Sequence, residues 1–189
     1  MKELAIFASG NGSNAQRIAE HFKSHPVIKV SLILSNKPDA YVLQRATELN
    51  IPSVTFNREE FYQTDKVLDI LVKNNIDFLV LAGFLWLVPH NILRAYPGRI
   101  INIHPALLPK YGGKGMYGSR VHQAVVDNRE KETGISIHWV NEHYDEGEII
   151  FQAKVEVEAA DTPDSIAGKV HALEYEHFPV IIEKEVSKL

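Results

Sequence analysis

IINIHPALLP, at residues 100–109, is the stretch that decides the fold class. Its β-branched residues, interrupted by Asn102, predict a short buried strand. Pro105 has no N–H to donate to a sheet, so this strand has to end near His104. An amide and an imidazole then lie on one face at the end of a strand, which is where α/β sheets bind ligands. Two interpretations stay open here, because Asn102 and His104 either bind a ligand or only hold the following turn.

The segments on both sides alternate between short apolar runs, which predict strands, and amphipathic stretches, which predict helices. The predicted strands cover residues 4–8, 28–34, 51–56, 78–82, 100–104, 134–140 and 149–157. The predicted helices cover residues 14–21, 40–49, 59–74, 90–95, 120–128 and 163 to about 186. This alternation predicts one Rossmann-like α/β domain over residues 1–189, with a mainly parallel central sheet, helices on both faces and an antiparallel C-terminal strand pair.

The composition narrows the class of protein. The chain has 189 residues, of which 45% are hydrophobic, a net charge of −4 and no cysteine. These values fit one well-buried domain and argue against nucleic-acid binding, a disulfide framework and thiolate metal sites. We find neither a signal-peptide pattern nor an apolar run of about 18 residues, so we expect a cytoplasmic protein without a membrane partner.

A glycine-rich turn, Ser9–Asn14, follows the first predicted strand and precedes a helix. Glycines let backbone N–H groups approach a ligand, and the start of a helix attracts anions, so this turn predicts a phosphate site. The spacing of Gly10, Gly12 and Ala15 also resembles a dinucleotide fingerprint, but no acid follows the second strand until Asp39. A tight turn without a ligand is the remaining alternative.

Two further loops have unusual compositions. Residues 83–89, GFLWLVP, are apolar and belong either to the core or to the wall of a pocket for a flat aromatic ligand. Residues 110–119, KYGGKGMYGS, contain four glycines and form either a loop that closes over a ligand or a disordered connector.

Several of these stretches together are similar to a known family. They are GNGSN at residues 10–14, AGF at 82–84, NIHP at 102–105, LLP at 107–109, and the segment from Gly134 to Gly147 that ends in DEG. Their order and spacing resemble the phosphoribosylglycinamide formyltransferases, which are folate-dependent enzymes of purine synthesis. The resemblance extends from Leu4 to about Ile182. It implies formyl transfer from 10-formyltetrahydrofolate to 5'-phosphoribosylglycinamide, giving 5'-phosphoribosyl-N-formylglycinamide and tetrahydrofolate.

The resemblance also implies roles for individual residues. Asn102, His104 and Asp145 match the catalytic set of the family. The acceptor phosphate is expected at Gly12, Ser13 and Asn14, and its ribose at Glu174. The residues expected to bind the folate are Leu85, Trp86, Leu87, Val88, Asn102, Asn141, Glu142, His143, Tyr144, Asp145 and, as the nearest match to an arginine at the folate tail, Arg58. The glycine-rich loop after Lys110 is longer than is usual in the family, so no contacts are transferred to it.

The chemistry of formyl transfer explains why such residues are needed. An amine attacks the formyl carbon, and negative charge develops on the formyl oxygen, where donors must already be in place. We expect the Asn102 amide and a His104 imidazolium to be those donors. Asp145 would keep His104 charged and relay a proton, and no metal is required.

Other functions remain as alternatives. The same three residues with water as nucleophile would give a formyl-folate hydrolase, and a transfer RNA formyltransferase would use them on another acceptor. A metal-binding protein would use His138, His143, Asp145 and Glu148, although the first two are poorly spaced. A non-catalytic nucleotide-binding module would leave the catalytic residues unexplained. We expect small-molecule substrates and a monomer or homodimer.

Overall fold

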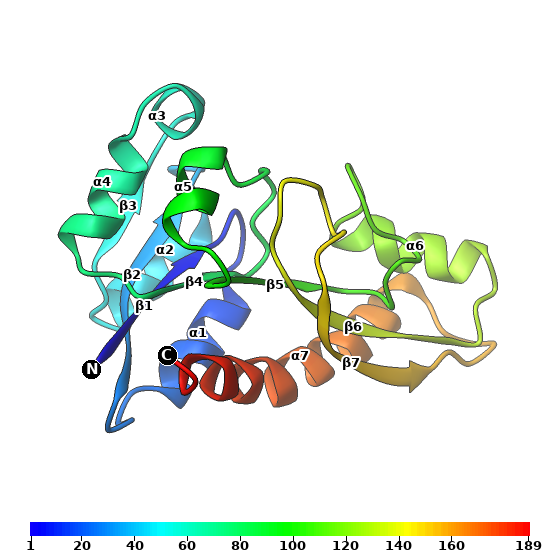
Figure 1. Cartoon of the computed structure of the whole chain (residues 1–189). Helices are drawn as coiled ribbons and strands as arrows, with labels where there is room; N and C mark the ends of the chain where they lie inside the picture. Colours follow the sequence, from blue (N-terminus) through cyan, green and yellow to red (C-terminus); the bar gives the residue numbers. More distant parts are fainter.

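The central sheet has seven strands in the order β3-β2-β1-β4-β5-β6-β7, and the computed structural model describes every residue from 1 to 189 (Figure 1). The first five strands in the chain are parallel, whereas β6 runs antiparallel to both of its neighbours, β5 and β7. The strands are β1 (Lys2–Phe7), β2 (Ile28–Ser35), β3 (Ser53–Thr55), β4 (Phe78–Leu81), β5 (Ile100–His104), β6 (Glu132–Trp139) and β7 (Ile149–Glu156). The predicted fold class is confirmed, although β3 is shorter than predicted.

Helices cover both faces of this sheet. They are α1 (Ser13–His21), α2 (Tyr41–Glu48), α3 (Arg58–Tyr62), α4 (Lys66–Lys73), α5 (His90–Ala95), α6 (Ser119–Asp127) and α7 (Pro163–Val186). In β1, Leu4 and Ile6 face the hydrophobic cluster of α1, α2, α6 and α7, while Ala5 and Phe7 face that of α3, α4 and α5. Burial on both faces explains why the central strands are apolar throughout.

The last helix, α7, packs against both α1 and α6 and against strands β6 and β7. Thr162 caps it through a hydrogen bond from the Ser165 N–H, and Pro163 occupies the first turn, as the sequence predicts. In Figure 1, α7 lies along one face, with its C-terminal end beside α1 and its N-terminal half near α6. This path brings the middle of α7 close to the glycine-rich turn after β1. No helix combines the length and the apolar character needed to cross a membrane.

The single helix predicted over residues 59–74 is wrong, because the chain forms two helices, α3 and α4, with a turn between them. The Thr64 hydroxyl donates to the Glu60 carbonyl at 3.0 Å and accepts from the Lys66 N–H at 3.2 Å. Such side-chain bonds replace the helical backbone bonds and end α3. Phe61 and the apolar residues of α4 face the same cluster, which conceals the break in the hydrophobic pattern.

Candidate active site

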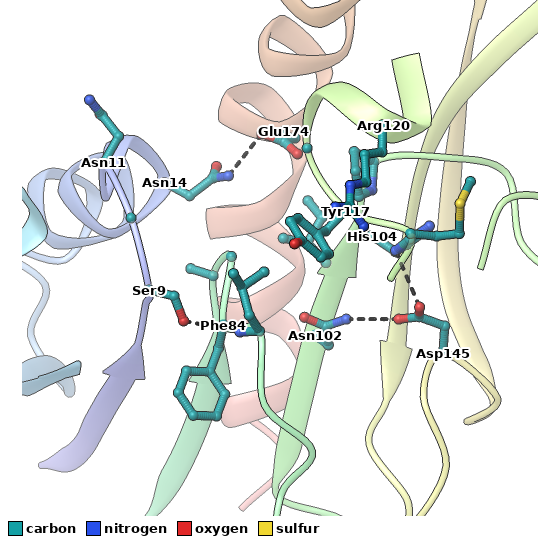
Figure 2. Close-up of a pocket in the computed structure, with 18 of the residues that line it drawn as sticks. Ser9, Asn11, Asn14, Phe84, Asn102, His104, Tyr117, Arg120, Asp145 and Glu174 are labelled. Carbon is teal, nitrogen blue, oxygen red and sulfur yellow. Dashed lines mark hydrogen bonds and ion pairs between the residues drawn. The ribbon is translucent and has the colours of Figure 1, made fainter. Parts of the chain in front are cut away.

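A cavity of about 600 Å³ opens at the carboxyl ends of β1, β4 and β5 (Figure 2). The chain leaves β1 toward β2 on one side, whereas β4 lies on the other, and such a switch point is where open α/β sheets bind ligands. The cavity is lined by residues 9–14, 82–85, 102–105, 113–118, 144 and 145, together with Lys37, Arg120, His122, His171 and Glu174. One cavity therefore connects the glycine-rich turn with the residues at the end of β5.

The structure brings together Asn102, His104 and Asp145. The first two lie on one face at the end of β5, and Asp145 approaches them from the connection between β6 and β7 (Figure 2). The distance from His104 Nδ1 to Asp145 Oδ2 is 3.5 Å, and Asn102 Nδ2 lies 3.4 Å from Asp145 Oδ1. An imidazole, an amide and a carboxylate therefore meet at one point of the cavity wall.

The backbone around Asp145 is strained, which fixes its position. Asp145 has a φ of 56°, in the left-handed region that non-glycine residues rarely adopt, and such strain is typical of functional sites. A Cβ added to Gly147 would lie 1.6 Å from the Trp139 carbonyl oxygen, so the turn can pack here only with glycine. The Gly113 N–H donates to Asp145 Oδ2 at 2.9 Å and holds the carboxylate in place.

The charge states of Asp145 and His104 follow from their surroundings. Burial raises the pKa of Asp145, but interactions with His138, His104 and the Gly113 N–H outweigh it and hold the pKa below its usual range. Burial is also the largest influence on His104 and lowers its pKa, which Asp145 and the Tyr111 carbonyl offset only in part. A lowered pKa favours a neutral His104 in the free protein, whereas the sequence predicted an imidazolium.

The tautomer of His104 can also be assigned. Its Nε2 lies 2.7 Å from the Tyr111 carbonyl oxygen, which only accepts, so Nε2 carries the proton of the neutral ring. The Nδ1 lone pair then faces the Asp145 carboxylate. A proton taken up at Nδ1 would turn this contact into an ion pair, so His104 and Asp145 together can accept a proton from a substrate.

His138 is a residue of this cluster that the sequence analysis placed only in the metal-binding alternative. It pairs with Asn102 across β5 and β6 and is buried. His138 Nδ1 donates to the Trp139 carbonyl at 2.9 Å, and its Nε2 lies 3.0 Å from Asn102 Nδ2 and 3.6 Å from Asp145 Oδ1. The Asn102 NH₂ group is then directed at His138 and Asp145, and its Oδ1 faces the cavity (Figure 2).

The orientation of the Asn102 amide differs from the expected one. The sequence predicted that the NH₂ group donates to the formyl oxygen, but in this arrangement the atom facing the cavity is an acceptor. Reversing the amide would place Oδ1 beside the Asp145 carboxylate, which is unfavourable. The alternation of Ser136 and His138 along β6 was the available sequence signal, but only the strand register shows which residues they face.

The turn after β5 is held by Ser136, whereas His104 bonds beyond it to the Tyr111 carbonyl. The Ser136 hydroxyl donates to the Ala106 carbonyl at 2.7 Å and accepts from the Leu108 N–H at 2.9 Å. Asn102 makes no hydrogen bond to this turn. Of the two interpretations of the Asn-x-His pair, the structure therefore favours a role in the cavity.

The glycine-rich turn after β1 is built for close approach of a ligand. Gly12 has a φ of 76°, and a Cβ there would lie 2.4 Å from Val42 Cγ2, so no other residue fits without displacement. No side chain caps α1, which leaves the first N–H groups of the helix free to bind an anion in the cavity. The Ser9 hydroxyl ties this turn to its neighbours by donating to Asn36 Oδ1 at 2.6 Å and accepting from the Leu85 N–H at 3.0 Å.

Glu174 reaches the same turn from α7. It is buried, and its Oε2 accepts a hydrogen bond from Asn14 Nδ2 at 2.8 Å. Burial raises the pKa of Glu174, and the hydrogen bond from Asn14 and the charge of His171 offset this only in part. The structure thus brings Glu174 together with Gly12, Ser13 and Asn14, the other residues expected to bind the acceptor.

Comparisons with known proteins agree with this geometry. The model of the formyl transferase family matches residues 2–182. The chain is 40% identical to phosphoribosylglycinamide formyltransferase, chloroplastic, of Arabidopsis thaliana, covering 98% of this chain and 67% of the relative, and 36% identical to that of Bacillus subtilis, covering 97% and 94%. The crystal structure of phosphoribosylglycinamide formyltransferase from Bacillus halodurans superposes with a TM-score of 0.88 at 36% identity, covering 99% and 96%.

The chain belongs to the phosphoribosylglycinamide formyltransferase family. It is therefore a formyltransferase. The phosphoribosylglycinamide formyltransferases catalyse formyl transfer in purine biosynthesis, and the formyltransferase family uses a formyl-folate as co-substrate. His138, His143, Asp145 and Glu148, the residues of the metal-binding alternative, do not form a group that could hold a metal ion.

The expected folate-binding residues of this formyltransferase divide into three groups. Leu85 and Tyr144 line the main cavity with Asn102 and Asp145. A second groove, of about 430 Å³, is lined by Leu87, Val88 and Glu142 with residues 62–65 and 89–91. Neither hollow is lined by Trp86, Arg58, Asn141 or His143.

Trp86 and Arg58 belong to an aromatic cluster next to these loops. The Trp86 ring lies 5.9 Å from the Tyr62 ring and 6.1 Å from that of Phe56. The Arg58 guanidinium lies over Tyr62 at 5.3 Å and over Trp86 at 5.8 Å. The apolar loop of residues 83–89 was expected either to join the core or to line a pocket. It does both, because Trp86 packs with the aromatic cluster while Leu85 lines the cavity.

The glycine-rich loop forms part of the formyltransferase cavity wall. Tyr111 has a φ of 57°, and its carbonyl accepts from His104. Its hydroxyl donates to Glu130 Oε1 at 2.8 Å, and burial together with Glu130 raises the pKa of Tyr111 to about 12. Residues 113–118 also line the cavity. Of the two predicted roles for this segment, the structure therefore favours a loop that lies over a ligand rather than a disordered connector.

Proposed function

We propose that the chain transfers the formyl group of 10-formyltetrahydrofolate to the amine of 5'-phosphoribosylglycinamide in de novo purine (IMP) biosynthesis. The products are 5'-phosphoribosyl-N-formylglycinamide and tetrahydrofolate. One observation carries the proposal: a single cavity has an anion-binding turn and a buried carboxylate at one end and Asn102, His104 and Asp145 at the other. Such a cavity can hold a phosphorylated ribose while its amine reaches the catalytic residues.

In this proposal the acceptor lies along the wall formed by α1 and α7. The N–H groups at Gly12, Ser13 and Asn14 bind its phosphate, because the start of α1 is uncapped and attracts negative charge. Glu174 accepts hydrogen bonds from the ribose hydroxyls. The Asn14 amide, which now donates to Glu174, is then shared with the ligand.

The folate occupies the other side of the cavity. We assign its pteridine to the walls formed by Leu85, Asn102, Tyr144 and Asp145. The rest of the folate extends over the neighbouring loops, for which the proposal retains Trp86, Leu87, Val88, Asn141, Glu142, His143 and Arg58. The formyl-folate supplies the activated carbonyl, and the protein supplies its orientation.

Asn102, His104 and Asp145 then act on the reacting groups. Asn102 Oδ1 accepts an N–H of the amine and directs its lone pair at the formyl carbon, where the new C–N bond forms. His104 Nε2, once released from the Tyr111 carbonyl, donates to the formyl oxygen as its charge develops, and one such donor is worth ~3 kcal/mol. The proton lost by the amine passes to His104 Nδ1 beside Asp145 and finally to folate N10, as the C–N10 bond breaks.

The experiment is an assay of the purified chain with 10-formyltetrahydrofolate and three acceptors: 5'-phosphoribosylglycinamide, initiator transfer RNA charged with methionine, and water alone. Mass spectrometry detects the formylated product, and the absorbance of tetrahydrofolate reports turnover. We expect product only with 5'-phosphoribosylglycinamide. Turnover with water alone would identify a hydrolase, and formylated transfer RNA would identify the other formyltransferase, so either result would overturn the proposal.

The proposal also includes a cytoplasmic location and assembly as a monomer or homodimer. Light scattering after size-exclusion chromatography measures the molar mass, which is 21.3 kDa for one chain. A trimer or larger assembly would contradict this part of the proposal and leave the reaction untouched.

A further inference from the structure

His122 is a buried histidine of α6 that the proposed mechanism does not use. It lines the active-site cavity although only 3% of its surface is exposed. Its Nδ1 is the one fully buried side-chain nitrogen or oxygen atom that has no hydrogen-bond partner. Buried polar atoms nearly always have a partner, so this exception in a cavity wall requires an explanation.

The proton of His122 can be placed on one of its two nitrogens. Burial lowers the pKa of His122, and the neighbouring His171 lowers it further, so the ring is neutral at pH 7. A proton on Nδ1 would leave a buried N–H without an acceptor, whereas a proton on Nε2 leaves only an unpaired lone pair inside. Orphaned buried N–H groups are the rarer of the two, so we place the proton on Nε2.

The direction of Nε2 follows from the same observations. No hydrogen bond within the protein involves Nε2, yet it is not one of the fully enclosed unpaired atoms. The exposed part of the His122 ring therefore includes Nε2, and the cavity is the space it faces. Nε2–H is thus a neutral donor without a partner that is directed into the site.

The end of the cavity at His122 is the acceptor end. His171 of α7 lies close enough to His122 to lower the pKa of His122. Glu174 follows His171 by one helical turn. Glu174 in turn contacts Asn14 in the anion-binding turn. An ionised Glu174 can only accept, so ligand oxygens that themselves accept hydrogen bonds need a donor from another side chain.

We propose that His122 is a further acceptor-binding residue, whose Nε2–H donates a hydrogen bond to an oxygen of the acceptor's phosphoribosyl group. The inference rests on the proposed function. It explains why a histidine with an unpaired inner nitrogen occupies a position where an apolar residue would pack without this penalty. When the acceptor binds, the hydrogen bond from Nε2 offsets the free-energy cost of leaving Nδ1 buried without a partner.

Three variants of His122 test the proposal. His122→Gln places an amide near the position of Nε2, His122→Asn places it near Nδ1, and His122→Leu removes both nitrogens at similar volume. A neutral hydrogen bond is worth ~1 kcal/mol, so the Asn and Leu variants should raise the KM for 5'-phosphoribosylglycinamide about fivefold. His122→Gln should stay close to the wild type, and kcat and the KM for 10-formyltetrahydrofolate should be unchanged in all three.

Thermal unfolding separates binding from a structural role. His122→Leu removes the unpaired Nδ1, so its Tm should equal or exceed that of the wild type while its acceptor affinity falls. Equal acceptor KM values for the Gln and Asn variants, or an unchanged KM for the Leu variant, would overturn the proposal. So would a lower Tm accompanied by parallel increases in both KM values. A wild-type chain that does not formylate 5'-phosphoribosylglycinamide would instead overturn the proposed function.

Discussion

Asp145, which is partly buried, and Glu174, which is buried, are two carboxylates in one cavity whose pKa values shift in opposite directions. The pKa of Asp145 is lowered and that of Glu174 is raised, although burial alone would raise both. Partners and burial both contribute to the difference. Asp145 is partly exposed, lies beside two imidazoles and accepts from the N–H of Gly113, whereas Glu174 is buried, accepts from the Asn14 amide and has His171 as its nearby positive charge.

This difference teaches that the two ends of the cavity use a carboxylate for different purposes. At the catalytic end, Asp145 stays ionised, so it can stabilise a proton that arrives at His104. At the acceptor end, Glu174 is held by a neutral amide, which ligand hydroxyl groups can replace without the loss of an ion pair. The deeper burial of Glu174 and the larger number of groups that favour the ionised form of Asp145 therefore distinguish the two roles.

The largest expected effect is on catalysis. Asp145→Asn keeps the shape of the side chain but removes the charge that would stabilise a proton at His104. We expect kcat to fall about 100-fold or more. Steady-state kinetics with both substrates at saturation measures this change.

A double variant shows whether Asp145 and His104 act as one unit. If they do, their losses do not add, so Asp145→Asn combined with His104→Ala should be little worse than His104→Ala alone. Folate affinity, followed by fluorescence titration, should survive in all these variants because the pteridine walls remain. Fully multiplicative losses would mean that the two residues act independently.

The comparison also shows what could be predicted from the sequence. The resemblance of local motifs placed both carboxylates in the site, and the hydrophobic alternation predicted the strands around them. Thr162 and Pro163 marked the start of the last helix because capping is a local property. Asp145 and Glu174 could be named, but their opposite pKa shifts could not, because these depend on partners distant in the chain.

The residues that were missed depend on long-range contacts. His138 meets Asn102 only through the register of β5 and β6, and His122 meets the cavity only through the packing of α6 against α7. The break between α3 and α4 was missed for the opposite reason. It depends on the hydrogen bonds of Thr64, which leave the apolar pattern unchanged.

The next largest effect is expected at the acceptor end. Glu174→Ala removes the group that accepts the ribose hydroxyls, so acceptor binding should weaken by roughly 1–3 kcal/mol. The KM for 5'-phosphoribosylglycinamide should rise accordingly, while the KM for 10-formyltetrahydrofolate stays constant. An unchanged acceptor KM would mean that Glu174 only holds Asn14 in place.

A third carboxylate, introduced at the start of α1, tests the anion site. Ser13→Asp adds a negative charge where the phosphate is expected, and charges at a helix N-terminus interact by roughly 0.3–1 kcal/mol or more. The acceptor KM should therefore rise, by about fivefold if the interaction is ~1 kcal/mol. Ser13→Ala is the matched control and should bind the acceptor nearly as well as the wild type. Equal changes in both substrate KM values would refute the assignment of this turn.

The smallest expected effects are on stability, and they should have opposite signs. The pKa of Asp145 in the folded chain lies below 3.8, so its charge stabilises the fold above that pH, and the stability is lost as pH falls through the lowered pKa. The pKa of Glu174 lies above 4.5, so folding takes up a proton between 4.5 and the raised pKa, and stability falls as pH rises through that range. At about pH 7.5, ionised Asp145 therefore favours folding, whereas ionised Glu174 opposes it.

Replacing each carboxylate by an amide of the same shape tests these opposite effects on stability, because the change in stability is measured as a change in Tm. At neutral pH, Asp145→Asn should lower Tm, whereas Glu174→Gln, which can still accept from Asn14, should raise it by about 2 °C for each ~0.5–1 kcal/mol gained. The advantage of Glu174→Gln should disappear as pH falls toward 4.5, because the wild-type carboxyl then becomes neutral as well. If both amides lowered Tm by the same amount at every pH, the two carboxylates would be equivalent. Their partners would then not determine their charge, and the proposed division of the cavity into a catalytic end and an acceptor end would lose its physical basis.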